Sequence, residues 1–118
     1  MKKDPFYKSL GYALSGIIQC IHKERNIKIH LVFMILVIIC GFLFRLSVIE
    51  WFICILLFAF VISLELINTA IEAVVDLCTQ EIHPLAKIAK DTAAGAVLVS
   101  AIASVIIGLI IFIPKIFS

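Results

Sequence analysis

Four polar side chains fall on one face of an apolar segment in the middle of the chain, and they are Glu65, Asn68, Glu72 and Asp76. At about 100° per residue, a helix would hold all four within an arc of about 80°. Carboxylates inside a membrane cost roughly 2.5 to 3.5 kcal/mol each near the bilayer centre, so a row of them needs a compensating partner. A helix end emerging into water would explain Asp76 and Glu72. It explains Glu65 poorly, because about eleven residues, or roughly 16 Å of helix, separate it from Asp76. We therefore favour a functional role for this polar stripe.

Clustered carboxylates have two common uses, which are to bind a hard cation such as Mg²⁺ and to pass protons. Glu24, before the first apolar run, could add an oxygen ligand or be a solvated charge. Lys90 and Asp91 precede the last apolar run, where Lys90 could also be an interfacial anchor and Asp91 a helix N-cap. The sequence contains neither a GxxxxGK[ST] loop nor the glycine-rich kinase motif. The residues alone thus leave a metal site and a proton pathway both open.

The composition indicates that these residues are carried by a membrane protein. Hydrophobic residues make up 64% of the 118 residues, and the mean hydropathy is +1.22. Apolar runs of about 20 residues match the roughly 30 Å thickness of the hydrocarbon layer. We expect an all-α integral membrane fold, formed by a single domain over 1–118, with three transmembrane helices over about 29–44, 51–77 and 92–113.

Two polar segments are expected to flank these spans on one side of the membrane. Residues 5–28 place apolar side chains at helical spacing and predict an amphipathic helix lying on the membrane surface. Residues 78–91 predict a polar loop, in which Pro84 should interrupt the helix. A tight turn carrying Arg45, Ser47 and Glu50 should join the first two spans.

The lysines and arginines predict the orientation of the chain in the membrane. Eight of the ten lie on one side of the predicted spans, namely Lys2, Lys3, Lys8, Lys23, Arg25, Lys28, Lys87 and Lys90. Because positive residues favour the cytoplasmic side, the N-terminus and the second loop should be cytoplasmic and the C-terminus outside.

Other features of the sequence exclude some classes of function. A net charge of +2 gives no basis for binding nucleic acid,. The four cysteines lack the spacing of a zinc site, so we interpret them as buried thiols. The small residues Ala96, Ser100, Ser104 and Gly108 recur every four positions and predict a helix-packing face that favours oligomers.

A long motif resembles that of a known family. The run from Glu65 through Asn68 and Glu72 to Asp76, followed by Ala89-Lys90-Asp91, is similar to the prokaryotic diacylglycerol kinase family, which includes undecaprenol kinases. Gly11-Tyr12, Gly16 and Glu24 are also in register. The resemblance implies a homotrimer of three-span subunits in the bacterial cell membrane, each with a surface helix. It also implies transfer of the ATP γ-phosphoryl group to a lipid hydroxyl at a site shared between neighbouring subunits.

The resemblance also implies roles for individual residues. Glu65 would be the general base and Asn68 would support the reacting groups, while Glu24 and Glu72 would hold Mg²⁺ on the ATP phosphates. The other residues implied at the nucleotide site are Tyr12, Asp76, Glu81, His83, Lys90 and Asp91. By residue type alone, Tyr12 could be an interfacial anchor and His83 an exposed loop histidine. Pro5 stands where some diacylglycerol kinases have a basic residue, with Lys8 as the nearest basic side chain.

The sequence leaves more than one substrate and more than one function open. Glu24-Arg25-Asn26 and the Ala-Lys-Ile-Ala-Lys-Asp segment favour the undecaprenol kinase branch, whose product is undecaprenyl phosphate. The alternative substrate is diacylglycerol, which would give phosphatidic acid. A small oligomeric proton-coupled transporter is the rival from another class, and a noncatalytic membrane scaffold is the other.

Overall fold

The fold is entirely helical over the part of the chain that can be described. A computed structural model describes residues 4–118 and has four α-helices and no strand among them. They are α1 (Phe6–Lys23), α2 (Arg25–Leu43), α3 (Val48–Cys78) and α4 (Pro84–Ile116). The last three are long and apolar enough to cross a membrane, which confirms the all-α prediction with three candidate spans. Lys2 and Lys3, which contributed to the predicted orientation, lie outside the described residues.

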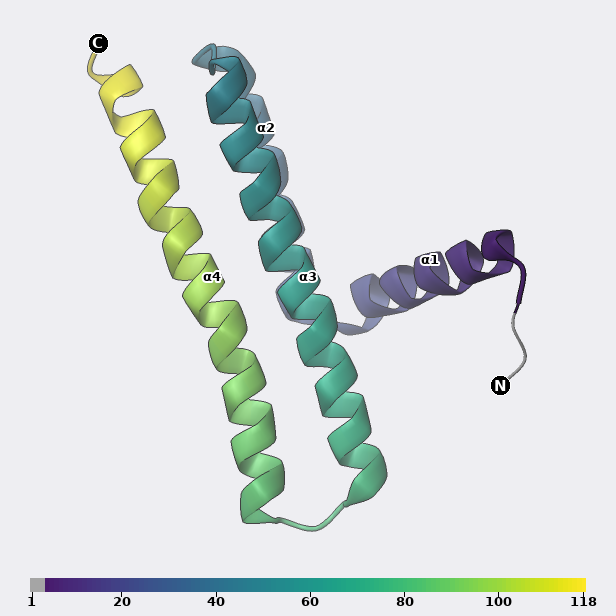
Figure 1. Ribbon diagram of the computed structural model, residues 1–118. Helices are drawn as coiled ribbons and strands as arrows, with labels where there is room; N and C mark the ends of the chain where they lie inside the picture. Colours follow the sequence, from purple (N-terminus) through teal and green to yellow (C-terminus); the bar gives the residue numbers. More distant parts are fainter. Residues whose placement is uncertain (1–3) are drawn as a thin grey trace.

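The chain breaks between α1 and α2 at Glu24, inside the segment 5–28 for which the sequence predicted a single surface helix. Glu24 has an extended backbone (φ −96°, ψ 124°) and caps both helices. The predicted boundary at residue 28 is therefore wrong, because Arg25–Lys28 form the first turn of α2. Figure 1 shows the result: α1 leaves the bundle at a steep angle to the other helices. Neither glycine nor proline stands at this junction to signal the break.

The connection between α3 and α4 is shorter than the predicted loop of 78–91. Pro84 begins α4 and does not interrupt it, because proline fits the first helical position, where its missing N–H is not needed,. The His83 ring then caps the helix by accepting a hydrogen bond at Nδ1 from the backbone N–H of Leu85 (3.1 Å). Lys90 and Asp91 consequently lie within α4, and Asp91 is not its N-cap.

The turn between α2 and α3 is held by local hydrogen bonds. Arg45 has a positive φ of 55°, and the N–H of Leu46 donates to the carbonyl of Gly41 at 3.0 Å, which closes the end of α2. Ser47 and Glu50 form a reciprocal capping box, with N···O distances of 2.9 and 3.2 Å,. Glu50 thus belongs to the first turn of α3 and not to the turn itself.

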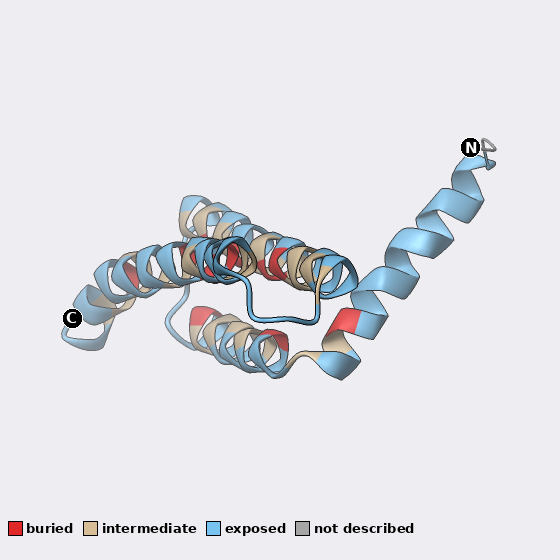
Figure 2. Cartoon of the chain, turned by 90° about the horizontal axis from the view of Figure 1, so that it is seen from below, coloured by how far each residue is buried: buried red, intermediate tan, exposed pale blue. Residues whose placement is uncertain are grey.

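The three long helices pack with α3 in the middle. It runs beside α4 along most of its length and also contacts α2 (Figure 1). A small core of Leu46, Cys54 and Ile111 lies near the turn between α2 and α3, with Trp51 and Phe112 packed against it. Figure 2 shows how few residues a single chain buries and that almost all of α1 is exposed. Lipid or other protein chains must cover such apolar faces.

Candidate active site

Glu65 is the most deeply buried carboxylate among the described residues. Its side chain is 0% exposed, and neither carboxylate oxygen has a hydrogen-bond partner. The nearest basic atom is Nε2 of His30 on α2, which lies 3.8 Å from Oε2. Most buried polar groups in proteins are paired, so an unpaired buried carboxylate needs an explanation beyond stability.

Asn68 and Glu72 continue the polar stripe along the same face of α3. The Asn68 amide donates from Nδ2 to Oε1 of Glu72 at 3.2 Å, one helical turn further along. Asn68 is only 4% exposed and its Oδ1 lacks a partner, whereas Glu72 is half-buried. Polar atoms with unused hydrogen-bonding capacity therefore extend from Glu65 toward the end of α3 that joins α4.

The break between α1 and α2 brings Glu24 to this stripe. On α1, the Cys20 thiol lies 3.3 Å from the Thr69 hydroxyl, and that hydroxyl donates to the Glu65 carbonyl at 3.0 Å. Ile27 on α2, which is 0% exposed, fixes the other side of the junction. Glu24 is half-buried there, and its charge acts on the Glu65 carboxyl together with that of Glu72. Glu24 thus lies close enough to the polar stripe to interact with it electrostatically.

The donor set near Glu65 fits Mg²⁺ as a partner of phosphates. Mg²⁺ keeps several waters and is usually bound by one or two carboxylates together with substrate phosphates. Residues 4–118 contain no group of three or more His, Cys, Asp or Glu side chains arranged to hold a metal by themselves. Glu24 and Glu72 provide two half-buried carboxylates, which suits a metal that binds together with ATP.

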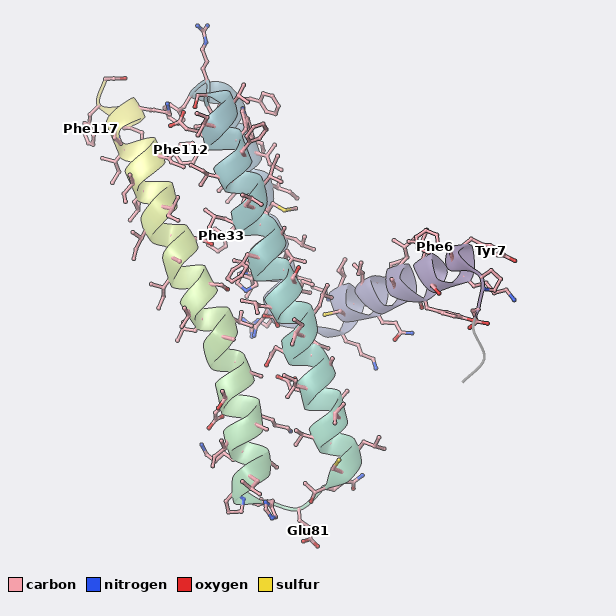
Figure 3. The ribbon with its side chains drawn as sticks, viewed as in Figure 1. Phe6, Tyr7, Phe33, Glu81, Phe112 and Phe117 are labelled. Atoms are coloured by element: carbon pink, nitrogen blue, oxygen red, sulfur yellow. The ribbon has the colours of Figure 1, made fainter. Side chains whose placement is uncertain are left out.

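A second polar feature is a groove at the joined ends of α3 and α4. It has a volume of about 610 Å³ and is lined by five predicted site residues, Asp76, Glu81, His83, Lys90 and Asp91. Lys90 Nζ lies 2.6 Å from Asp76 Oδ1 and so links the two helices, while Lys87 pairs with Asp91. Figure 3 shows Glu81 on the loop, directed away from both helices. The groove therefore contains both charge signs and opens to solvent.

Comparison with known proteins assigns the chain to a family. The model of the prokaryotic diacylglycerol kinase family matches residues 11–112, which is most of the chain. The chain belongs to the prokaryotic diacylglycerol kinase family. The polar stripe, Glu24 and the groove all lie within the matched residues.

Individual members of this family differ in the substrates after which they are named. The chain is 56% identical to undecaprenol kinase of Bacillus subtilis (strain 168) over 110 residues, covering 93% of this chain and 89% of the relative. It is 44% identical to diacylglycerol kinase of Synechocystis sp. over 111 residues, covering 93% and 63%, respectively. Diacylglycerol kinase of Helicobacter pylori (strain J99) is 35% identical over 98 residues, covering 81% and 75%.

Not every residue that the kinase resemblance implied is brought to the site within one chain. Tyr12 lies on α1, is 61% exposed, and does not line the groove at the joined ends of α3 and α4. Figure 3 shows Phe6 and Tyr7 at the far end of α1, well away from the long helices. Any contact between Tyr12 and a nucleotide would therefore require a neighbouring subunit or a different placement of α1.

Sequence reasoning missed one residue next to the stripe. His30 contacts Glu65 from α2, but it was treated as part of an apolar span. A usable signal was present, because an ionisable side chain inside a membrane span is a candidate functional residue by default. The sequence did not show how α2 is oriented about its axis, and this orientation directs His30 toward α3.

Proposed function

We propose that this protein transfers the γ-phosphoryl group of ATP to the hydroxyl of undecaprenol and forms undecaprenyl phosphate. Membership of the family makes the protein a lipid kinase. The choice of lipid is supported by the 56% identity to a protein named undecaprenol kinase, over most of both chains. Diacylglycerol remains the alternative substrate, since the 44% identical relative is named for it.

The observation that carries the mechanism is the buried, unpartnered carboxylate of Glu65. In the proposed reaction, a Glu65 oxygen accepts the proton of the lipid hydroxyl while the hydroxyl oxygen bonds to the γ-phosphorus of ATP. The bond from that phosphorus to the β,γ-bridging oxygen breaks, and ADP leaves. The unpaired Oδ1 of Asn68, one turn away, would accept a hydrogen bond from the reacting groups. Positioned groups of this kind account for most of the catalysis in phosphoryl transfer.

Mg²⁺ would be held by Glu24 and Glu72 together with the ATP phosphates. When bound, the metal supplies positive charge that neutralises the phosphates and orients the transferred group. The two carboxylates come from the α1–α2 junction and from α3, so the position of the metal depends on the contact between Cys20 and Thr69.

The groove at the joined ends of α3 and α4 would bind the rest of the nucleotide. Asp76 is about eleven residues, or roughly 16 Å of helix, from Glu65. An extended nucleoside triphosphate could reach along the stripe from the groove to the buried base. Lys90 would exchange its pairing with Asp76 for a phosphate oxygen, and Asp91, Glu81 and His83 would contact the remainder.

We further propose that α1 lies on the cytoplasmic surface of the bacterial cell membrane and that three chains assemble into a homotrimer with shared sites. The support is the family resemblance, the exposed apolar faces of the long helices and the projecting position of α1. Cytoplasmic placement of the α3–α4 loop would put the groove in the compartment that contains ATP.

The central test is a phosphorylation assay with labelled ATP, Mg²⁺ and purified protein in bilayers. Undecaprenol and diacylglycerol are offered separately and in competition. Preferential labelling of undecaprenol would support the proposal, and preference for diacylglycerol would transfer it to the alternative substrate. Glu65→Gln should abolish turnover while leaving ATP binding largely intact, and chelation of Mg²⁺ should stop the reaction. Full turnover by Glu65→Gln would contradict the assignment of the base.

The orientation can be tested with a native cysteine. The interpretation of all four cysteines as buried thiols is wrong for Cys78, which is exposed at the end of α3, whereas Cys20 and Cys54 are buried. A thiol reagent that cannot cross membranes should label Cys78 in inside-out vesicles but not in intact cells, with Cys78→Ser as the control. Labelling in intact cells would reverse the proposed orientation. Native mass spectrometry of the protein should give a mass of three chains, and a monomer alone would exclude the trimer.

A further inference from the structure

His30 stands where the polar stripe meets the apolar interior. It lies near the start of α2, and its side chain is 21% exposed. Among residues 4–118, it is the only basic side chain with a nitrogen within 4.0 Å of Glu65. The 3.8 Å separation of Nε2 and Oε2 is somewhat longer than a hydrogen bond, and the contact is ionic only when the imidazole is protonated,.

The surroundings of His30 make this contact stronger than it would be at the surface. The imidazole also lines an apolar groove of about 370 Å³, whose walls include Phe33 of α2, Phe58 of α3 and Val105 of α4. Figure 3 shows Phe33 between the ribbons of α4 and α3. Charge and dipole interactions are less screened among apolar side chains than in water. On the polar side, the charged group in contact with His30 is Glu65, with Glu24 and Glu72 acting on the same carboxyl.

We propose that His30 is a positioning residue for Glu65. With its proton on Nε2, the imidazole donates to Oε2 of Glu65 after a side-chain movement of less than about 1 Å. This bond fixes the plane of the carboxylate and leaves Oε1 free to accept the proton of the lipid hydroxyl. It also offsets part of the repulsion among the three carboxylates of Glu65, Glu24 and Glu72. The inference rests on the proposed role of Glu65 as the base.

Packing alone would give His30 a different role. A histidine that only fills the wall of the apolar groove could be replaced by a leucine of similar size with little effect on turnover. A positioning histidine requires a donor at that place, so glutamine should substitute for it better than leucine does. The two roles therefore predict different rankings of the leucine and glutamine variants by turnover, and not only different losses of turnover.

Kinetics on the full-length protein in bilayers test the first consequence. His30→Leu should lower kcat by about 10- to 100-fold with KM for ATP changed less than about twofold, because misplacing a reacting group mainly affects the chemical step. His30→Gln should recover most of that loss. His22→Leu, which removes an exposed histidine of α1, is the matched control and should be unchanged. Equal activity of the leucine and glutamine variants of His30 would overturn the proposal.

A double-mutant cycle provides a readout that does not depend on catalysis. The unfolding midpoint in detergent is measured for His30→Leu in the native chain and in Glu65→Gln. If His30 acts through the carboxylate charge, its replacement should shift the midpoint in the native chain and shift it much less in the Glu65→Gln background. Equal shifts in both backgrounds would overturn the contact.

The two proposals can fail separately. Activity retained by Glu65→Gln would remove the base and with it the role of His30 in catalysis. An inactive Glu65→Gln together with a fully active His30→Leu would instead leave the base in place and refute the inference about His30 alone.

Discussion

Replacing Glu65 by leucine should stabilise the protein while abolishing its activity. Both carboxylate oxygens are buried without hydrogen-bond partners, and an unsatisfied buried polar group costs about 1 to 3 kcal/mol,. The variant also loses the 3.8 Å contact with His30, but that separation is too long for a hydrogen bond, so this loss offsets only part of the gain,. Leucine is close to glutamate in size and leaves no large cavity. The expected net gain in the free energy of unfolding is therefore about 1 to 2 kcal/mol.

This gain can be measured by equilibrium unfolding of the detergent-solubilised protein with increasing SDS, next to a phosphorylation assay on the same preparation. Ser63→Leu is the matched control, because Ser63 is exposed on the same helix and its replacement should change stability by less than about 0.5 kcal/mol,. A Glu65→Leu variant less stable than the native chain by 1 kcal/mol or more would show that the carboxylate has a structural partner. That result would refute the reasoning that its burial serves catalysis.

Three further substitutions probe the parts that hold the site in place. Lys115→Met should lower the free energy of unfolding only slightly and leave turnover unchanged, because its ammonium lies 3.0 Å from Glu50 at the end of the bundle remote from the site,; a loss of activity at full stability would contradict this. Gly41→Ala should destabilise by about 1 to 2 kcal/mol in the same unfolding assay, because a Cβ there would lie 2.5 Å from a ring carbon of Trp51,; unchanged stability would mean that the indole moves freely. Arg45→Gly should raise the free energy of unfolding by about 0.5 to 1 kcal/mol, because a residue with a side chain is strained at a φ of 55° and glycine is not,. A destabilised variant would indicate that the arginine makes a compensating contact.

The polar stripe could be predicted from sequence because a helix repeats every 3.6 residues. Glu65, Asn68 and Glu72 need only that period to share a face, and α3 is continuous through all of them,. The three spans could be predicted for a similar reason, since length and apolarity determine what crosses a hydrocarbon layer. These are properties of single segments and require no knowledge of how segments pack.

The predicted helix boundaries were wrong where a residue is compatible with two local backbone conformations. Glu24 is extended although nothing in its type forbids a helix, and the break is stabilised by tertiary contacts such as the burial of Ile27. A proline can interrupt a helix or stand at its first position. At Pro84 the cap formed by His83 stabilises the start of α4,. The contact of His30 with Glu65 was also out of reach, because the orientation of α2 about its axis is set by packing against α3.

Some polar side chains of α3 have hydrogen-bond or ionic partners and others do not, and the two kinds lie at different places along the helix. At the end near the α2–α3 turn, Glu50 forms hydrogen bonds with Ser47 and an ion pair with Lys115, and both contacts stabilise that end of the bundle. Further along, Glu65 and Asn68 are more deeply buried and yet retain free oxygen atoms. Burial of free acceptors costs stability, and a chain could avoid that cost with leucine or alanine. Their presence in the middle of α3 is what the proposed reaction requires, because the lipid hydroxyl and the other reacting groups would provide the missing partners.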